Sequence, residues 1–221
     1  MNNPLSYQNA RKDVLSLIEK DGIILDVGCN NGSSGNYYKK NINSNATVYG
    51  VDYNPEAIQE AKICLDNAEV LNLNDLDSCI KYCSSLNEID TLIFADVLEH
   101  LIDPLGVLNL FSSKISKGGH VIISIPNSGF YLSYINLISG KWPRNERGIY
   151  DKTHTTIFLR NNLSELIPNG FELCTLKRNL RLLEGRVYTS RFDRFILPLI
   201  GAIPIIRELF TFQYIIKIEK R

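Results

Sequence analysis

The sequence has no excess of either charge and no apolar run long enough to cross a membrane. Its 221 residues contain 24 lysines and arginines against 24 aspartates and glutamates, so the formal net charge is zero. Nucleic-acid-binding proteins normally present a basic surface, and overall neutrality argues against a nucleic-acid partner. The apolar segment 195–206 is twelve residues long, whereas a membrane-spanning helix takes about 20.

Other features that the sequence lacks indicate the cellular compartment in which the protein works. The five cysteines form no C-x-x-C pair, which favours reduced, mostly buried thiols over disulfides or a metal site. No basic segment followed by an apolar run opens the sequence, so we expect no signal peptide and a cytoplasmic protein. Apolar residues at 44% and charged residues at 22% exclude a collagen-like or disordered chain.

Short apolar runs alternate with helix-like segments along the chain, which predicts an α/β fold with a mostly parallel sheet covered by helices. We expect strands at 22–27, 47–51, 69–73, 90–95, 120–125, 171–177 and 212–218. Helices are expected at 6–20, from the glycine-containing turn to about residue 42, from Pro55, and after Asp103-Pro104, with a turn at 117–119.

A turn rich in glycine and asparagine follows the first predicted strand. Glycine lets the backbone approach a ligand, and the helix that follows offers free N–H donors. Only Gly28 matches the dinucleotide fingerprint G-x-G-x-x-G, because Asn30 and Ser33 stand at its other glycine positions. The sequence therefore argues against a nicotinamide-dependent dehydrogenase.

Asp52 ends the second predicted strand, twenty residues after Gly32. A carboxylate at this place can accept hydrogen bonds from both hydroxyls of a ribose. Alternatively, Asp52 caps the helix that begins at Pro55.

Two carboxylates and an imidazole follow the fourth predicted strand, in the order Asp96, Glu99 and His100. On a helical turn these three positions share one face. Three interpretations stay open: His100 is a general base, the trio binds a divalent cation, or the side chains form a capping network that shapes a pocket.

Four motifs in order carry a resemblance to a known family. The sequence contains LDVGCNNG, then VDYNPEAI, then FADVLEHLIDPLGVL, then KGGHVIISIPN. It resembles the class I S-adenosylmethionine-dependent methyltransferases over about residues 10–175. The resemblance implies a Rossmann-like, doubly wound sheet of seven strands with the last strand antiparallel and helices on both faces. The cofactor site that it implies consists of Asp26, Gly28, Cys29, Asn30, Gly32, Asp52, Tyr53, Asn74, Asp75, Leu76, Ala95 and Asp96.

The D-x-x-E-H spacing at 96–100 is similar to the E-x-x-E-H of ubiquinone-biosynthesis O-methyltransferases, in which the trio is associated with magnesium. The resemblance therefore implies Mg²⁺ at Asp96, Glu99 and His100. The D-x-T-H at 151–154 resembles methyltransferases that modify bacterial cell-surface polysaccharides and sugars. His154 is then either a second candidate base or a histidine that ties a loop to the sheet.

We expect the segment after the fifth strand to form part of the acceptor-binding site. Trp142 and Tyr150 can stack on sugar rings, and Arg144 and Arg147 can bind phosphate. We therefore predict O-methylation of a sugar or glycan intermediate of polysaccharide biosynthesis, which can be lipid-linked. The alternatives are a quinone-type or other small lipid phenol, and a cofactor-binding subunit without catalysis.

The charge is skewed near the C-terminus. Residues 177–194 hold six basic side chains against two acidic ones, and the apolar segment 195–206 follows directly. This pattern fits peripheral contact of 177–210 with the anionic inner face of a membrane. It fits equally an insertion at 179–210, between the last two strands of a single domain 1–221, that packs on the domain or on a homodimer partner.

Overall fold

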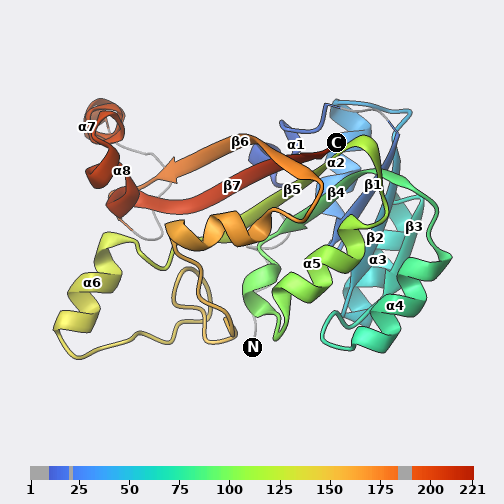
Figure 1. Cartoon of the computed structure of the whole chain (residues 1–221), viewed down its shortest axis with the longest axis horizontal. Helices are drawn as coiled ribbons and strands as arrows, with labels where there is room; N and C mark the ends of the chain where they lie inside the picture. The colour runs from blue at the N-terminus through green and yellow to red at the C-terminus, as the bar shows by residue number, and fades with distance from the viewer. Residues whose placement is uncertain (1–9, 20–21, 184–190) are drawn as a thin grey trace.

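One mixed sheet organises the chain, and the predicted seven strands with an antiparallel last strand are confirmed (Figure 1). The structure is a computed structural model and describes residues 10–19, 22–183 and 191–221. The strand order is β3-β2-β1-β4-β5-β7-β6, and β7 runs antiparallel to both of its neighbours. The strands are β1 Ile23–Val27, β2 Thr47–Asp52, β3 Asn67–Val70, β4 Ile89–Ala95, β5 Ile115–Pro126, β6 Phe171–Leu180 and β7 Thr211–Lys220.

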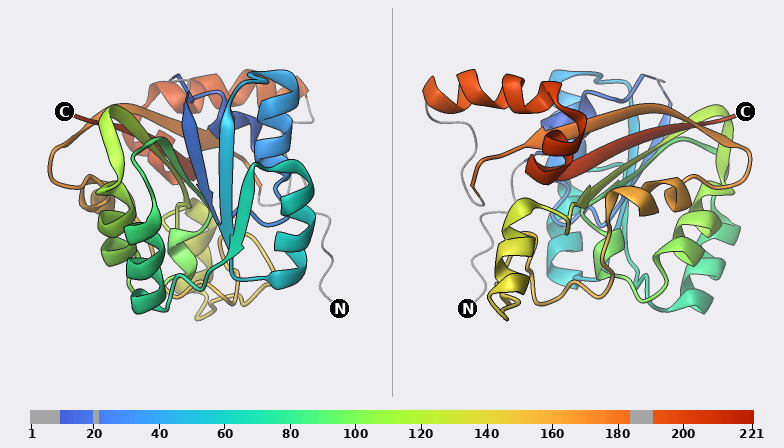
Figure 2. Two further views of the ribbon diagram at one scale, coloured as in Figure 1. Left: turned by 90° about the vertical axis from the view of Figure 1, so that its right-hand side faces the viewer. Right: turned by 60° about the vertical axis from the view of Figure 1, so that its left-hand side comes forward.

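Helices cover both faces of the sheet, as the views in Figure 2 show. On one face α4, α5 and the 3₁₀ segment η3 contribute to a core with the central strands, and on the other face α1, α2 and α3 do so. The helices are α1 Lys12–Leu15, α2 Ser33–Asn41, α3 Pro55–Cys64, α4 Leu76–Ser85, α5 Pro104–Ser112, α6 Tyr131–Ile138, α7 Arg191–Ala202 and α8 Pro204–Phe210, with 3₁₀ segments η2 Leu98–His100 and η3 Arg160–Leu166.

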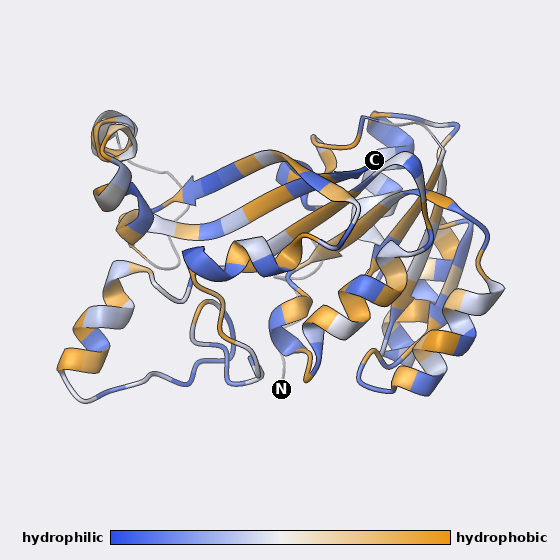
Figure 3. Ribbon diagram, in the orientation of Figure 1, coloured by the Kyte–Doolittle hydropathy of each residue, from blue (hydrophilic) through white to orange (hydrophobic). Residues whose placement is uncertain are grey.

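The central strands β1, β4 and β5 are largely apolar in their middle parts because both of their faces are covered. Leu92, Phe94, Ile122 and Ile123 are fully or almost fully buried, and Figure 3 shows hydrophobic residues along β4 and β5. The strand order reverses between β1 and β4, and open α/β sheets bind ligands at the carboxyl edge of the sheet beside such a reversal.

Three predicted boundaries are wrong. The third strand was expected at 69–73 but occupies Asn67–Val70, and the helix expected at 6–20 is regular only at Lys12–Leu15 within the described residues. The turn predicted at 117–119 lies inside β5, where the register with β4 shifts between the pairs Ile89–Ile115 and Thr91–His120. Glycines at this point permit an irregular strand as readily as they permit a turn, so the sequence alone does not separate the two.

The segment between β6 and β7 contains α7 and α8, which lie side by side at one end of the molecule (Figure 1). Leu197 is buried, whereas Leu199 and Ile203 expose half of their surface or more. No helix among the described residues is long and apolar enough to cross a bilayer.

Candidate functional site

The turn after β1 has the left-handed backbone that its glycines predict. Gly28 and Gly32 have φ angles of 78° and 75°, and Asn30 adopts 49°. A Cβ atom on Gly28 would lie 2.4 Å from Cγ2 of Val97, so only glycine fits there. Asparagine tolerates this conformation better than other non-glycine residues, which explains why the turn survives at Asn30.

Asp52 holds this turn against the end of β2. Its Oδ2 accepts a hydrogen bond from the backbone N–H of Asn30 at 2.9 Å, and its Oδ1 accepts one from Asn54 at 2.9 Å. The capping alternative is wrong, because Asn54 caps α3 by accepting from the N–H groups of Glu56 and Ala57. Asp52 is buried, yet each oxygen keeps a further lone pair that a ribose hydroxyl can use.

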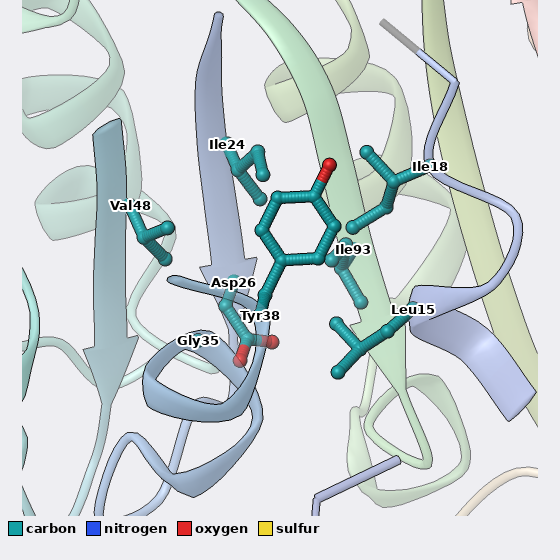
Figure 4. Close-up of a pocket in the computed structure, with 8 residues that line it drawn as sticks. All are labelled: Leu15, Ile18, Ile24, Asp26, Gly35, Tyr38, Val48 and Ile93. Atoms are coloured by element: carbon teal, nitrogen blue, oxygen red, sulfur yellow. The ribbon is translucent and has the colours of Figure 1, made fainter. Parts of the chain in front are cut away.

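Asp26 lies on β1 beside the same turn, next to apolar side chains that include Ile24, Tyr38 and Ile93 (Figure 4). Burial, together with the nearby charge of Asp52, raises the pKa of Asp26 to about 7, although Arg11 acts in the opposite direction. Without a cationic partner, ionised Asp26 is therefore costly in this place. A bound ammonium group would supply that partner.

Arg11 is the site residue that no sequence motif pointed to. It precedes α1, and its guanidinium group binds the carboxylate of Asp96 and donates to Oγ of Ser124 at 3.0 Å. It also pairs with Asp13 at 3.0 Å. Burial would lower the pKa of Arg11, but the two carboxylates outweigh burial and raise it. Arg11 therefore stays charged at the carboxyl edge of the central strands, where Asp13 and Asp96 balance its charge.

Asp96 follows β4 in a left-handed conformation with a φ of 59°. Besides Arg11, its carboxylate accepts hydrogen bonds from Oγ of Ser124 and Nε2 of Gln213, both at 2.6 Å. The helical turn expected to include Asp96 is instead a 3₁₀ turn at Leu98–His100. Asp96 is thus part of the Arg11 network and does not share a helical face with the carboxylate and imidazole that follow it.

Glu99, His100 and His154 form a second group. One ligand-type atom of each lies within 4.8 Å of the others, so the structure brings together both predicted base candidates. Glu99 is 1% exposed, and its Oε2 has no hydrogen-bond partner in the described part of the chain. Burial, and next the charge of Asp96, hold the pKa of Glu99 well above its usual range, which favours the uncharged acid.

Both imidazoles are held through Nδ1. Nδ1 of His154 lies 3.2 Å from the carbonyl oxygen of Ile149, and Nδ1 of His100 lies 3.0 Å from Oγ1 of Thr153. The Thr153 hydroxyl donates to Asp151 at 2.6 Å, so it must accept from His100. In each ring Nδ1 therefore carries the proton, which leaves Nε2 free to accept one.

The two rings lie edge to face with centroids 4.8 Å apart. Burial, and next the neighbouring His100, lower the pKa of His154. His154 is therefore neutral at neutral pH, with Nε2 available as a base.

The donors around His100 do not suit magnesium. Mg²⁺ prefers ionised carboxylates and water in octahedral geometry, but Asp96 is occupied by Arg11, Ser124 and Gln213. The remaining carboxyl, that of Glu99, has a raised pKa. Two imidazole nitrogens are better ligands for transition metals than for Mg²⁺.

The other predicted cofactor residues lie at or after the ends of β1, β2, β3 and β4. Cys29 is buried at the glycine turn, and Gly32 precedes the first turn of α2. Tyr53 is 76% exposed. Asn74 accepts from the N–H of Ile102 at 2.9 Å. Asp75 caps α4 and Leu76 begins that helix, and Ala95 is the last residue of β4.

The predicted acceptor side is divided between buried and exposed groups. Trp142 packs edge to face on Tyr150, with ring centroids 5.3 Å apart. Tyr150 is buried, so it supports Trp142 rather than offering its own face. Arg144 and Arg147 are exposed.

Comparisons with known proteins show which family the chain is similar to. A family model described as a methyltransferase domain matches residues 18–164. The ubiquinone biosynthesis O-methyltransferase of Vibrio parahaemolyticus is 30% identical over 144 residues, which cover 62% of this chain and 59% of that protein. A tRNA U34 carboxymethyltransferase of Campylobacter fetus is 32% identical over 124 residues, which cover 52% of this chain and 39% of that protein. The chain thus spans less than two thirds of the length of these relatives.

Solved structures share the whole fold. The structure of an S-adenosylmethionine-dependent methyltransferase from Archaeoglobus fulgidus superimposes with a TM-score of 0.61 at 19% identity, and covers 99% of this chain and 97% of that chain.

Proposed function

Because this chain belongs to the class I S-adenosylmethionine-dependent methyltransferases, we propose that it transfers the methyl group to a hydroxyl of a sugar or glycan intermediate. The choice of an oxygen as the acceptor atom rests on the two imidazoles beside Glu99. Each ring is held through Nδ1, so its Nε2 can accept a proton. A hydroxyl must lose its proton when it is methylated, and a neutral imidazole can accept that proton.

The cofactor would lie over the carboxyl ends of β1 and β4, where the strand order reverses. In this proposal Asp52 accepts hydrogen bonds from the ribose hydroxyls, and the glycine turn contacts the methionyl part of the cofactor. Asp26 faces the methionyl ammonium group, which supplies a cationic partner for its buried carboxylate. Asp26 lies on β1 beside this turn.

Methyl transfer would be an in-line displacement at the sulfonium carbon. The acceptor oxygen forms the new C–O bond while the C–S bond breaks, and its proton passes to Nε2 of His154. His100 orients that ring by edge-to-face contact and is itself held through Thr153 by Asp151. Holding the methyl donor and the acceptor at attack distance can lower the activation barrier by about 7–11 kcal/mol.

Replacing the base should separate chemistry from cofactor binding. We expect His154→Ala to lower kcat by about 100- to 10,000-fold, because the acceptor then loses its general base. The affinity for S-adenosylmethionine should stay unchanged. His120→Gln is the matched control, since the third histidine of the chain lies at the start of the β5 pairing with β7, far from the carboxyl edge. Full turnover by His154→Ala would reassign the base to His100 or to water.

Turnover should not depend on magnesium. We expect the same rate in the presence of EDTA as in excess Mg²⁺, because Asp96 is already bound by Arg11, Ser124 and Gln213. The measurement is methyl transfer after dialysis against chelator. An activity lost on chelation and restored by Mg²⁺ would contradict this assignment.

The acceptor class depends on the exposed ring of Trp142 and on the arginines near it, which suit a sugar or sugar phosphate. If the acceptor is a lipid-linked glycan, it lies at the membrane, and peripheral membrane contact through 177–210 would bring the enzyme to it. A quinone-type phenol is the second candidate, favoured by the identity with the ubiquinone-biosynthesis enzyme. Product analysis with sugar nucleotides and with a catechol-type phenol distinguishes the two, and binding of cofactor without any product would favour a non-catalytic subunit.

A further inference from the structure

A group of three arginines around one glutamate lies outside the site described so far. Glu208, on α8, is 13% exposed at its side chain and pairs with Nε of Arg178 at 2.9 Å, Nη2 of Arg207 at 3.6 Å and Nε of Arg160 at 3.8 Å. The buried hydroxyl of Tyr214 donates to its second oxygen at 2.8 Å. We call these three arginines with Glu208 the arginine cluster.

The arginine cluster has more positive charge than its own carboxylate can balance. In the described part of the chain, no other carboxylate pairs with Arg160, Arg178 or Arg207, so the cluster carries a net charge of about +2 at neutral pH. The Nε atom of Arg207 is buried and has no hydrogen-bond partner among the described residues. Buried donors of this kind are costly unless a ligand or solvent satisfies them.

The arginine cluster lies at the edge of the sheet that holds the proposed acceptor site. Strand β7 starts where β5 ends, since Pro126 pairs with Gln213. Asn127 then ties the end of α8 to this edge by donating to the carbonyl oxygens of Glu208 and Thr211 at 3.1 and 2.8 Å.

The same face of the sheet holds the cluster and the segment that follows His154. Arg178 pairs with Tyr214 across the two strands, so both point to the face covered by α4, α5 and η3, where Tyr214 joins the core. Arg160 begins η3 and follows His154 by six residues, so the two Cα atoms lie no more than roughly 20 Å apart.

We propose that the arginine cluster is a subsite for the phosphate or diphosphate group of the acceptor. Guanidinium groups bind phosphoryl oxygens with two parallel hydrogen bonds, and a diphosphate would balance the excess charge. This inference rests on the proposed function, because it assigns the anionic end of the molecule whose hydroxyl meets His154. The same group occurs in soluble sugar nucleotides and in lipid-linked diphosphates.

Inorganic pyrophosphate is the probe that tests this subsite without any methyl transfer. Calorimetry at low salt should show binding to the wild-type chain. The double variant Arg160→Gln/Arg207→Gln should lose at least about 10-fold in affinity, because it removes two charged donors. Arg178 is left in place because it holds Glu208 directly. Arg221→Gln is the matched control, since Arg221 lies just after the opposite end of β7 and should leave the affinity unchanged.

Thermal unfolding and S-adenosylmethionine binding show whether the double variant is folded. No pyrophosphate binding by the wild-type chain, or an equal loss in Arg221→Gln, would overturn the subsite even if methyl transfer is found. Uridine diphosphate glucose and farnesyl diphosphate separate the two sources: whichever binds more tightly, and loses that affinity in the double variant, identifies the form that the subsite accepts. Pyrophosphate binding without transfer to any sugar would keep the subsite and remove the proposed reaction.

Discussion

Asp52→Ala is expected to weaken S-adenosylmethionine binding by at least about 100-fold, equivalent to roughly 2.7 kcal/mol. The variant removes the carboxylate proposed to accept the ribose hydroxyls. It also releases the N–H groups of Asn30 and Asn54, which both donate to Asp52, so the glycine turn loses its anchor on β2. Calorimetric titration with the cofactor measures the change directly.

The matched control for Asp52 is Asp103→Ala. Asp103 also holds a backbone N–H, that of Gly106 at the start of α5, at 2.9 Å. Its loss should lower stability by about 1 kcal/mol, the usual cost of a helix cap, and should leave cofactor affinity unchanged. An unchanged affinity in Asp52→Ala would remove the ribose assignment.

Asp26→Asn is expected to stabilise the cofactor-free protein above about pH 7 while it weakens cofactor binding. The folded state raises the pKa of Asp26 from 3.8 to about 7, so folding favours the protonated acid. The resulting stability is fully present below the unfolded pKa and is lost as pH rises through the folded value. A shift of this size corresponds to at most about 4 kcal/mol, and asparagine does not incur this loss.

Thermal unfolding at about pH 5 and about pH 8 tests this expectation. Since about 1 kcal/mol moves the Tm of a chain of this size by roughly 2–4 °C, the variant should gain up to about 16 °C over wild type at the higher pH and much less at the lower one. The same variant should bind S-adenosylmethionine more weakly, because it cannot offer a negative charge to the ammonium group. Equal pH dependence in both proteins would show that Asp26 titrates normally.

Local pattern was enough to predict the sheet and the contact between Asp52 and the glycine turn. The apolar run of β1, the glycine turn at Gly28 and the acid at Asp52 are each encoded within a few residues, and strand ends at one edge of a parallel sheet meet wherever the intervening helices lie. This is why Asp52 was placed next to the turn although the two are more than twenty residues apart.

Contacts set by the tertiary fold could not be predicted in this way. Arg11 precedes the first strand and carries no motif, yet it neutralises Asp96 and thereby takes it out of the predicted metal trio. His154 replaces Asp96 beside Glu99 and His100 because the loop after α6 returns to η2, where Thr155 and Thr156 donate to the carbonyl oxygen of Glu99. No spacing within the sequence encodes that return.

The network around Asp96 also determines when the site can form. Its partners include Arg11, which precedes β1, and Gln213 on β7, so Asp96 has all of its partners only after β7 has been synthesised. Domains begin to fold from the N-terminus during synthesis. A nascent chain that has completed β1 to β5 already has the glycine turn and Asp52, but its Asp96 lacks Gln213 until β7 leaves the ribosome. Full assembly of the Asp96 network is therefore a late event, which follows the synthesis of β7.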